Sequence, residues 1–298
     1  MSIVTNFQAV PSRLLSVYTA LAETESGLVR EHLASWATPP SLSMRGGGDD
    51  DDASTALFTN ALSEAKRLGL VEDDGERVRV TEVARGKSGG NADHQANFIS
   101  FVRDTLFDPE RAARAGQAGV LYALAWFLTK SPLKPLGFSD APQNTLREDL
   151  GQFAEKVELG STSSFQNLLY WARFLGFATV VGSAGSRRVF PDPSRAISTA
   201  LGKVLPDSNW VDIDVFLLRL AATYPVLEGG SVREEIEANR TTPAAIDGSL
   251  SLATSLALQR LADRGSISLD VVADARARIL DFGDSTKRVS RVRRGEVA

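Results

Sequence analysis

Basic residues gather near the end of this 298-residue chain. Between Lys287 and Arg294, five of the eight residues carry a positive charge, two valines are interleaved, and no acid follows until Glu296. The five are Lys287, Arg288, Arg291, Arg293 and Arg294. A strand of this pattern would present a dense positive edge to the phosphates of DNA, where each contact adds affinity that falls with salt. A solvated edge strand, protected by its charges from pairing with another chain, explains the same residues and remains an alternative.

Two other stretches carry a weaker form of the same signal. Arg187 and Arg188 begin a segment that alternates between polar and apolar residues, which is typical of a half-buried strand. Arg77 and Arg79 alternate with valines in the same way, but the acidic segment from Glu72 to Glu76 precedes them. We therefore expect Arg187 and Arg188, rather than Arg77 and Arg79, to contact phosphate.

The composition excludes several kinds of chemistry. The chain has no cysteine, which rules out disulfides, thiolate nucleophiles and cysteine-ligated metals, and its two histidines are too few for a histidine-rich metal site. It contains no Gly-rich phosphate loop of the Walker type and no Gly-x-Gly-x-x-Gly after a strand. Asp281, Asp284 and Lys287 only faintly resemble the carboxylates and lysine of a nuclease. We expect a protein that is not an enzyme and holds no metal or cofactor.

The overall charge is close to neutral. The 33 basic and 37 acidic residues give a net charge of −4, so any site for a polyanion must be local. The first ten residues lack the basic and apolar regions of a signal peptide. The longest apolar run, residues 120–128, is about half as long as a bilayer requires. These features predict a cytoplasmic protein without membrane contact.

One arrangement recurs three times along the chain. A helical segment with apolar residues seven and four positions before a glycine is followed by a predicted hairpin. The glycines are Gly69, Gly176 and Gly265, and the apolar pairs are Leu62 with Ala65, Leu169 with Ala172, and Leu258 with Leu261. A glycine after the last helical turn is typical of a left-handed cap. The hairpins are predicted to turn at residues 73–75, 182–185 and 283–286.

This order of helices followed by a basic hairpin resembles the winged-helix superfamily over roughly residues 10–88, 143–195 and 211–295. The resemblance implies a mainly α fold with small β-hairpins (α+β), in which three winged-helix repeats are joined by a helical connector. The expected parts are residues 1–91, a connector at residues 92–142, residues 143–205 and residues 206–298. In the first repeat, Leu14, Val17, Tyr18 and Leu21 share one face of a helix. Further helices are expected at residues 26–36 and 54–68.

In winged helices that bind DNA, the third helix enters the major groove and the wing touches the backbone, because polar side chains on such a helix can reach base edges. The resemblance therefore implies contacts with double-stranded DNA from the exposed faces of three helices. Those faces carry Thr59, Asn60, Ser63, Lys66 and Arg67 in the first repeat, Ser161, Thr162, Ser163, Gln166, Asn167, Tyr170 and Arg173 in the second, and Thr254, Ser255, Gln259 and Arg260 in the third. Any solvated helix face carries similar residues, so both interpretations remain open.

Two features favour contacts with protein instead. The glycine-rich segment 46–52 ends in four aspartates, Asp49 to Asp52, which would repel phosphate ahead of the first repeat's third helix. A solubilising loop explains them, and so does a surface for a protein partner; a second loop is expected at residues 86–91. The connector carries Phe98, Phe101, Val102 and Leu106 on one face, and residues 120–128 are apolar nearly all round. Such helices must be covered, either between the first two repeats or by a dimer or partner.

Three repeats in 298 residues, beginning with Pro11 and Ser12 ahead of an apolar helix and ending in the basic strand, are similar to the DpdG-like accessory components of bacterial anti-phage and DNA-modification islands. That resemblance implies partner subunits, and modified or foreign DNA as the target. We therefore expect a non-enzymatic DNA-binding protein, acting as an accessory or regulatory subunit of a bacterial DNA-transacting or phage-defence system. The alternative is a scaffold whose winged helices bind protein, in a larger complex or as a homodimer, without direct DNA contact.

Overall fold

The computed structural model describes residues 2–6, 8–37, 50–86, 93–183, 185–242 and 248–295, with the backbone alone at residue 37 and over residues 50–56. Contacts divide the chain into two units, Met1–Ala118 and Gly119–Ala298. The fold is mainly helical with small antiparallel sheets, which confirms the predicted fold class. Within the described ranges, every helix is too short or too polar to cross a bilayer.

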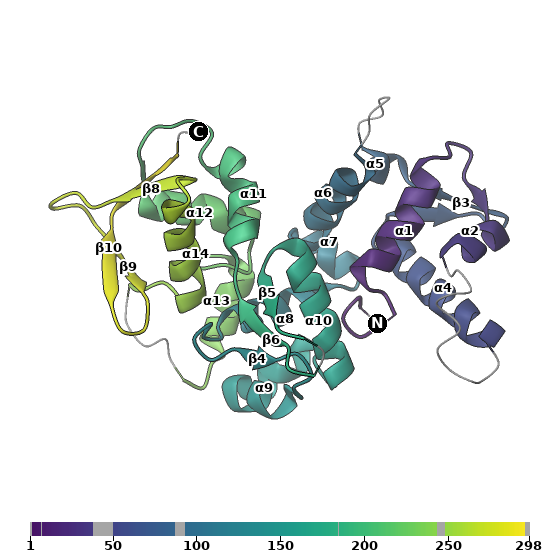
Figure 1. Ribbon diagram of the computed structural model, residues 1–298, viewed down its shortest axis with the longest axis horizontal. Helices are drawn as coiled ribbons and strands as arrows, with labels where there is room; N and C mark the ends of the chain where they lie inside the picture. The colour runs from purple at the N-terminus through teal and green to yellow at the C-terminus, as the bar shows by residue number, and fades with distance from the viewer. Residues whose placement is uncertain are drawn as a thin grey trace. The chain divides into compact units, whose positions relative to one another are not determined.

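The first unit contains α1 (Pro11–Ala22), β1 (Leu28–Val29), α2 (Arg30–Ala37), α4 (Asp50–Arg67), β2 (Val71–Asp73), β3 (Arg77–Val80), α5 (Glu82–Arg85), α6 (His94–Leu106) and α7 (Pro109–Arg114) (Figure 1). The predicted apolar face of α1, from Leu14 to Leu21, is buried. Helix α4 begins at Asp50, before the predicted start at Ser54, so Asp50–Asp52 lie within the helix. Asp49, with the rest of the predicted loop before it, and residues 87–91 of the second predicted loop lie outside the described residues.

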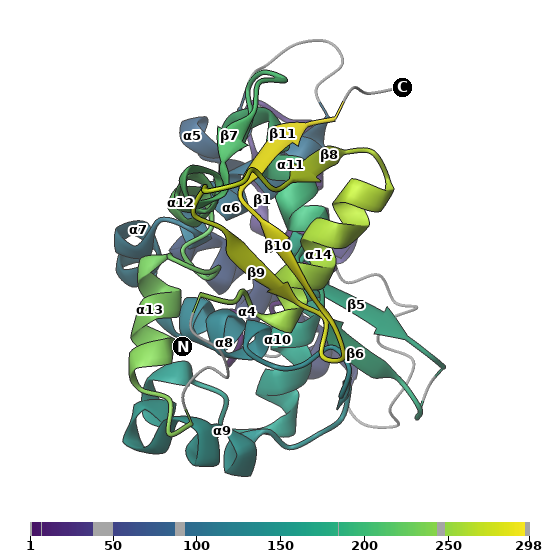
Figure 2. The same ribbon diagram turned by 90° about the vertical axis from the view of Figure 1, so that its left-hand side faces the viewer.

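The second unit contains α8 (Ala118–Leu128), β4 (Leu136–Gly137), α9 (Gln143–Leu150), the 3-10 helix η1 (Gly151–Val157), α10 (Thr162–Leu175), β5 (Ala178–Val181), β6 (Arg188–Pro191), α11 (Ser194–Val204), β7 (Val211–Asp212), α12 (Ile213–Thr223), α13 (Ser231–Ala238), α14 (Leu252–Asp263), β8 (Ile267–Asp270), β9 (Arg278–Asp281), β10 (Thr286–Val289) and β11 (Arg291–Arg294) (Figures 1 and 2). The apolar helix α8 is buried on all sides except at Ala118 and Tyr122, as its composition predicts.

One order of elements occurs three times: a helix, a two-residue strand, two helices and two strands. We call these copy 1 (α1 to β3), copy 2 (α8 to β6) and copy 3 (α11 to β11). In each copy the two-residue strand pairs with the last strand, giving the sheet orders β1-β3-β2, β4-β6-β5 and β7-β11-β8. Copy 2 has one addition, the 3-10 helix η1 after α9, and copy 3 has two, helix α13 and the β9–β10 hairpin between β8 and β11 (Figure 2).

The pairing of the short strands is apolar in every copy. Leu28 lies opposite Val78, Leu136 opposite Val189, and Val211 opposite Val292. All three valines are completely buried. Each two-residue strand therefore pairs with a buried valine near the start of the last strand of its copy. Elements α8 and β4 of copy 2 come from residues 92–142, the predicted connector, and α11 of copy 3 comes from residues 143–205.

The recurring glycine ends the third helix of each copy in the same way. Gly69, Gly176 and Gly265 have φ angles of 75°, 92° and 72°, which L side chains adopt only at a cost. The backbone N–H after each glycine donates to the carbonyl five residues earlier, at 2.9, 2.7 and 2.9 Å. This is the Schellman cap, which satisfies carbonyls at a helix end and turns the chain into the following strand.

Candidate nucleic-acid interface

The predicted basic strand is divided into two strands at Ser290. Strand β10 pairs with β9, whereas β11 is the central strand between β7 and β8. Ser290 is buried, donates its N–H to the Asp270 carbonyl (2.9 Å) and accepts at Oγ from the Val272 N–H (2.8 Å). The interpretation as a single edge strand is therefore wrong, since β11 has neighbours on both sides. The interleaved valines, Val289 and Val292, are both completely buried.

Strand β10 presents Lys287 and Arg288, both exposed. The Lys287 ammonium donates to Gln259 Oε1 of α14 at 3.1 Å, and Gln259 Nε2 donates to Asp263 at 2.6 Å. Among the described residues no acid pairs with Arg288. The structure therefore brings the hairpin strand beside the third helix of copy 3, and two predicted DNA contacts, Lys287 and Gln259, touch each other.

On β11, two of the predicted arginines are engaged within the protein. Arg291 donates two hydrogen bonds to Asp270 Oδ2 (3.0 and 2.6 Å), and its guanidinium lies 4.5 Å from the centre of the Trp210 ring. Arg293 lies 4.9 Å from the same ring. The hydrogen bond from Arg291, with the Val271 N–H, lowers the pKa of Asp270. Trp210 is not among the residues predicted from the sequence; it lies just before β7, the strand that pairs with β11.

The predicted DNA contacts of copy 2 lie on α10 and at the start of β6. Arg187 stacks on Phe138, with 4.0 Å from the guanidinium carbon to the ring centre, while Arg188 on β6 is exposed. Gln166 donates to Ser139 Oγ at 3.2 Å. Arg173 is exposed in the last turn of α10.

Three residues predicted on exposed helix faces are buried. Asn167 is 1% exposed, because it lies on the packed side of α10. Thr254 donates to a carboxylate oxygen of Glu228 at 2.6 Å, which satisfies its buried hydroxyl. Ser255 accepts at Oγ from the Asp281 N–H at 3.0 Å. These three side chains hold α10 and α14 in place, so they do not face solvent as predicted.

Arg260 of copy 3 forms an ion pair with Asp192 of copy 2 at 2.6 Å. Asp192 also accepts from the hydroxyls of Ser194 (2.5 Å) and Thr179 (2.9 Å). Burial alone would raise the pKa of Asp192, but the Ser194 hydrogen bond, the Arg260 charge and the Thr179 hydrogen bond together lower it. Arg260 therefore joins the two copies.

Several basic residues of copy 1 lie close to acids. Lys66 donates to Asp73 at 3.1 Å, and Arg67 lies 3.9 Å from Glu64. Arg79 pairs with Glu72 at 2.5 Å. The field of these cations is therefore partly cancelled locally, in line with the weaker signal expected from this part of the sequence.

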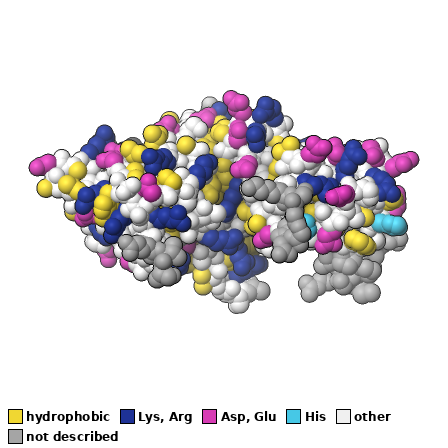
Figure 3. Space-filling view, turned by 90° about the horizontal axis from the view of Figure 1, so that it is seen from above, with side chains coloured by type: hydrophobic (Ala, Val, Ile, Leu, Met, Phe, Trp, Pro, Cys, Tyr) yellow, Lys and Arg dark blue, Asp and Glu magenta, His cyan; other side chains and the backbone are white. Residues whose placement is uncertain are grey.

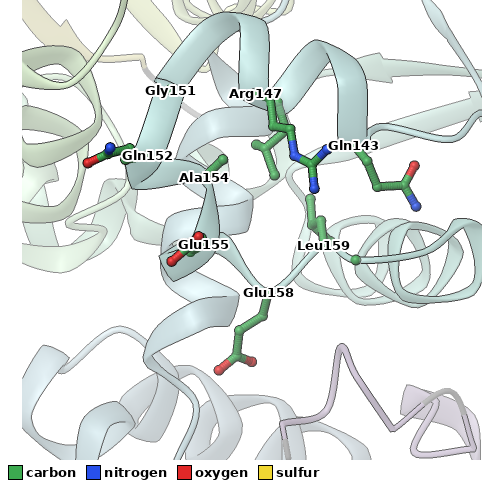
Figure 4. A pocket seen from close by; sticks show the side chains of 10 residues that line it. Gln143, Arg147, Gly151, Gln152, Ala154, Glu155, Glu158 and Leu159 are labelled. Atoms are coloured by element: carbon green, nitrogen blue, oxygen red, sulfur yellow. The ribbon is translucent and has the colours of Figure 1, made fainter.

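Charge over the molecular surface is mixed. On the face drawn in Figure 3, basic and acidic side chains of the described residues are interspersed. Across the described ranges, no group of three His, Asp or Glu side chains could hold a metal ion. A pocket of about 520 Å³ lies between α9 and η1, with Arg147 and Gln143 on one side and Glu155 on the other (Figure 4). Its lining contains no histidine, serine or lysine.

A family model described as DpdG-like matches residues 1–275, a range that ends before β9. The basic residues of β10 and β11 lie beyond the match. Neither a curated protein nor a solved structure matches the chain.

Proposed function

The chain belongs to the DpdG-like family, and we propose that it is a non-enzymatic DNA-binding accessory subunit of a bacterial DNA-modification or phage-defence system. Its three copies would be winged helices, because each has a helix, a short strand, two helices and a hairpin whose last strand pairs with the short one. The observation that carries the proposal is the contact between Lys287 and Gln259. It places an exposed basic hairpin strand beside α14, the arrangement with which winged helices contact the DNA backbone and the major groove.

The structure separates the basic residues into two sets that DNA would use differently. Lys287 and Arg288 are exposed, whereas Arg291 and Arg293 are half-buried and stack on Trp210. An arginine that already contacts an acid or an aromatic ring must give up those contacts in order to bind a phosphate, which reduces the net free energy of binding. The β10 pair should therefore supply more of the binding energy than the β11 pair.

The experiment is a fluorescence-anisotropy titration of double-stranded DNA at about 50 and 200 mM salt. The proteins are the wild type, Lys287→Ala with Arg288→Ala, Arg291→Ala with Arg293→Ala, and Lys203→Ala. Lys203→Ala is a single-charge control, because Lys203 is exposed on α11 and belongs to neither strand of the β9–β10 hairpin. If Lys287 and Arg288 each contact one phosphate, their loss reduces the slope of log K against log salt by about 2. Binding that persists in the β10 variant with an unchanged slope contradicts the proposed interface.

A second candidate, a protein-binding scaffold, is favoured by an exposed apolar strip on α12. Leu218 is 67% and Val215 40% exposed, and three-residue spacing places them on one helix face. If the protein is a scaffold of this kind, the wild type is expected not to bind DNA in the anisotropy titration. Sedimentation velocity then tests whether the chain associates with itself and whether Leu218→Glu abolishes that association.

A further inference from the structure

Three arginines line one pocket at the junction of copies 2 and 3. The pocket has a volume of about 300 Å³ and lies against the end of α10, strand β5 and the start of α11. Arg173 comes from the last turn of α10, Arg195 from the first turn of α11, and Arg264 caps the C-terminus of α14. This volume is at the lower end of the range for small-molecule sites, roughly 300–1,000 Å³.

The one carboxylate in the lining is already compensated. Asp192 is held by Arg260, which is not itself part of the lining, and by the hydroxyls of Ser194 and Thr179. Within the described part of the chain, no acid forms an ion pair with Arg173, Arg195 or Arg264. The pocket therefore holds three arginine charges and one acid, Asp192, whose negative charge is balanced by Arg260 outside the lining.

The backbone at Gly176 allows this gathering. Its φ is 92°, and a Cβ there would lie 2.9 Å from the backbone nitrogen of Ala196 and 3.2 Å from Cβ of Arg195. The Ala196 N–H donates to the Gly176 carbonyl at 3.1 Å. The absence of a side chain thus lets α11 begin directly against the end of α10, so Arg195 and Arg173 line the same pocket.

Arg195 retains donors for a ligand. One of its terminal nitrogens donates to the Phe174 carbonyl at 2.9 Å, which orients the guanidinium and leaves its other N–H groups available. Like charges held together repel, and an anion between them removes that repulsion. Guanidinium forks match the oxygens of phosphate in geometry as well as in charge.

We propose that this arginine pocket binds a phosphate group. The phosphate belongs either to a small phosphorylated ligand or to the DNA backbone, and both present the same oxygens to the arginines. No residue of β9 or β10 lines the pocket, so the proposed site is built from other residues than the DNA contact proposed for Lys287 and Arg288.

The test uses the full chain and two probes, pyrophosphate in calorimetry and double-stranded DNA in anisotropy. The variant is Arg173→Gln with Arg264→Gln, which removes two charges from exposed side chains that make no ion pair among the described residues. The control is Lys203→Gln, which removes one charge from an exposed side chain outside the pocket lining. Circular dichroism and the midpoint of thermal unfolding verify that the variant is folded. Each lost charge-assisted hydrogen bond should weaken the probe that binds here by about tenfold or more.

The outcomes separate the two sources and the two proposals. Pyrophosphate binding that the double variant loses supports a free phosphorylated ligand, and it does so even if the wild type fails to bind DNA. DNA binding that both the double variant and the β10 variant weaken, without pyrophosphate binding, supports a backbone phosphate. If pyrophosphate does not bind and the double variant binds DNA like the control, the arginine pocket proposal is overturned while the β10 interface stands.

Discussion

The capping glycines allow a stringent test of the packing between copies 2 and 3. Gly176 and Gly265 both have positive φ angles, so alanine at either position carries the strain of a left-handed conformation, roughly 1–2 kcal/mol. A Cβ at Gly265 has nothing within 4 Å, whereas a Cβ at Gly176 lies 2.9 Å from the backbone of α11. Forced overpacking adds typically 1–3 kcal/mol. We expect Gly265→Ala to lower the free energy of unfolding by about 1–2 kcal/mol and Gly176→Ala by about 2–5 kcal/mol.

Urea denaturation followed by tryptophan fluorescence measures this difference. A Trp36→Phe background leaves three of the four tryptophans, all in the second unit, two of them buried, so the signal reports that unit alone. The midpoint should fall further for Gly176→Ala, with an unchanged slope. Equal losses for the two variants would show that α11 does not press against Gly176, and that the close approach described above is wrong.

Three further predictions concern the second unit. Leu258→Ala, in the buried face of α14, should lower the free energy of unfolding by about 2–5 kcal/mol in the same urea assay; a loss below about 1 kcal/mol would contradict the described packing. Because the pKa of Asp192 is lowered by its partners, its contribution is complete above its ordinary pKa of 3.8 and is lost as the pH falls through the folded value. The stability difference between wild type and Asp192→Asn should therefore shrink in acid, and a constant difference would refute this. Burial, with the hydrogen bond to Glu235, raises the pKa of Tyr122 to about 12, so its contribution is complete below pH 10 and is lost as the pH rises toward 12. Stability curves of wild type and Tyr122→Phe should converge over that range, and parallel curves would count against it.

Local signals in the sequence predict the helices and the hairpins well. The cap hydrogen bonds join residues that are only five positions apart in the chain. The local spacing of residues is therefore enough to place Gly69, Gly176 and Gly265 at helix ends. The apolar face of α1 and the all-round burial of α8 follow in the same way from side-chain periodicity.

The two-residue strands could not be predicted, because a strand of that length has no periodicity. Val211 is held by Val292, which lies far along the chain. The division at Ser290 has a similar origin, since it depends on hydrogen bonds to Asp270 and Val272 rather than on any local turn signal.

The polar faces of the third helices were the least predictable part of the site. Sequence pattern assigns Thr254 and Ser255 to solvent because they are polar. Their burial depends on partners supplied by other segments, Glu228 and the Asp281 N–H. A polar side chain is stable inside a protein when its hydrogen bonds are satisfied, and a single sequence does not reveal those partners.

Helix α11, the first helix of copy 3, also contacts copy 2. Its first turn is hydrogen-bonded to the end of α10, while its body packs against α12 and α14 as α1 packs against α2 and α4. A cut between β6 and α11 would leave copy 2 without the helix that covers the end of α10 and would expose the first turn of α11 in copy 3. A shortened protein made for study should therefore keep or omit copies 2 and 3 together.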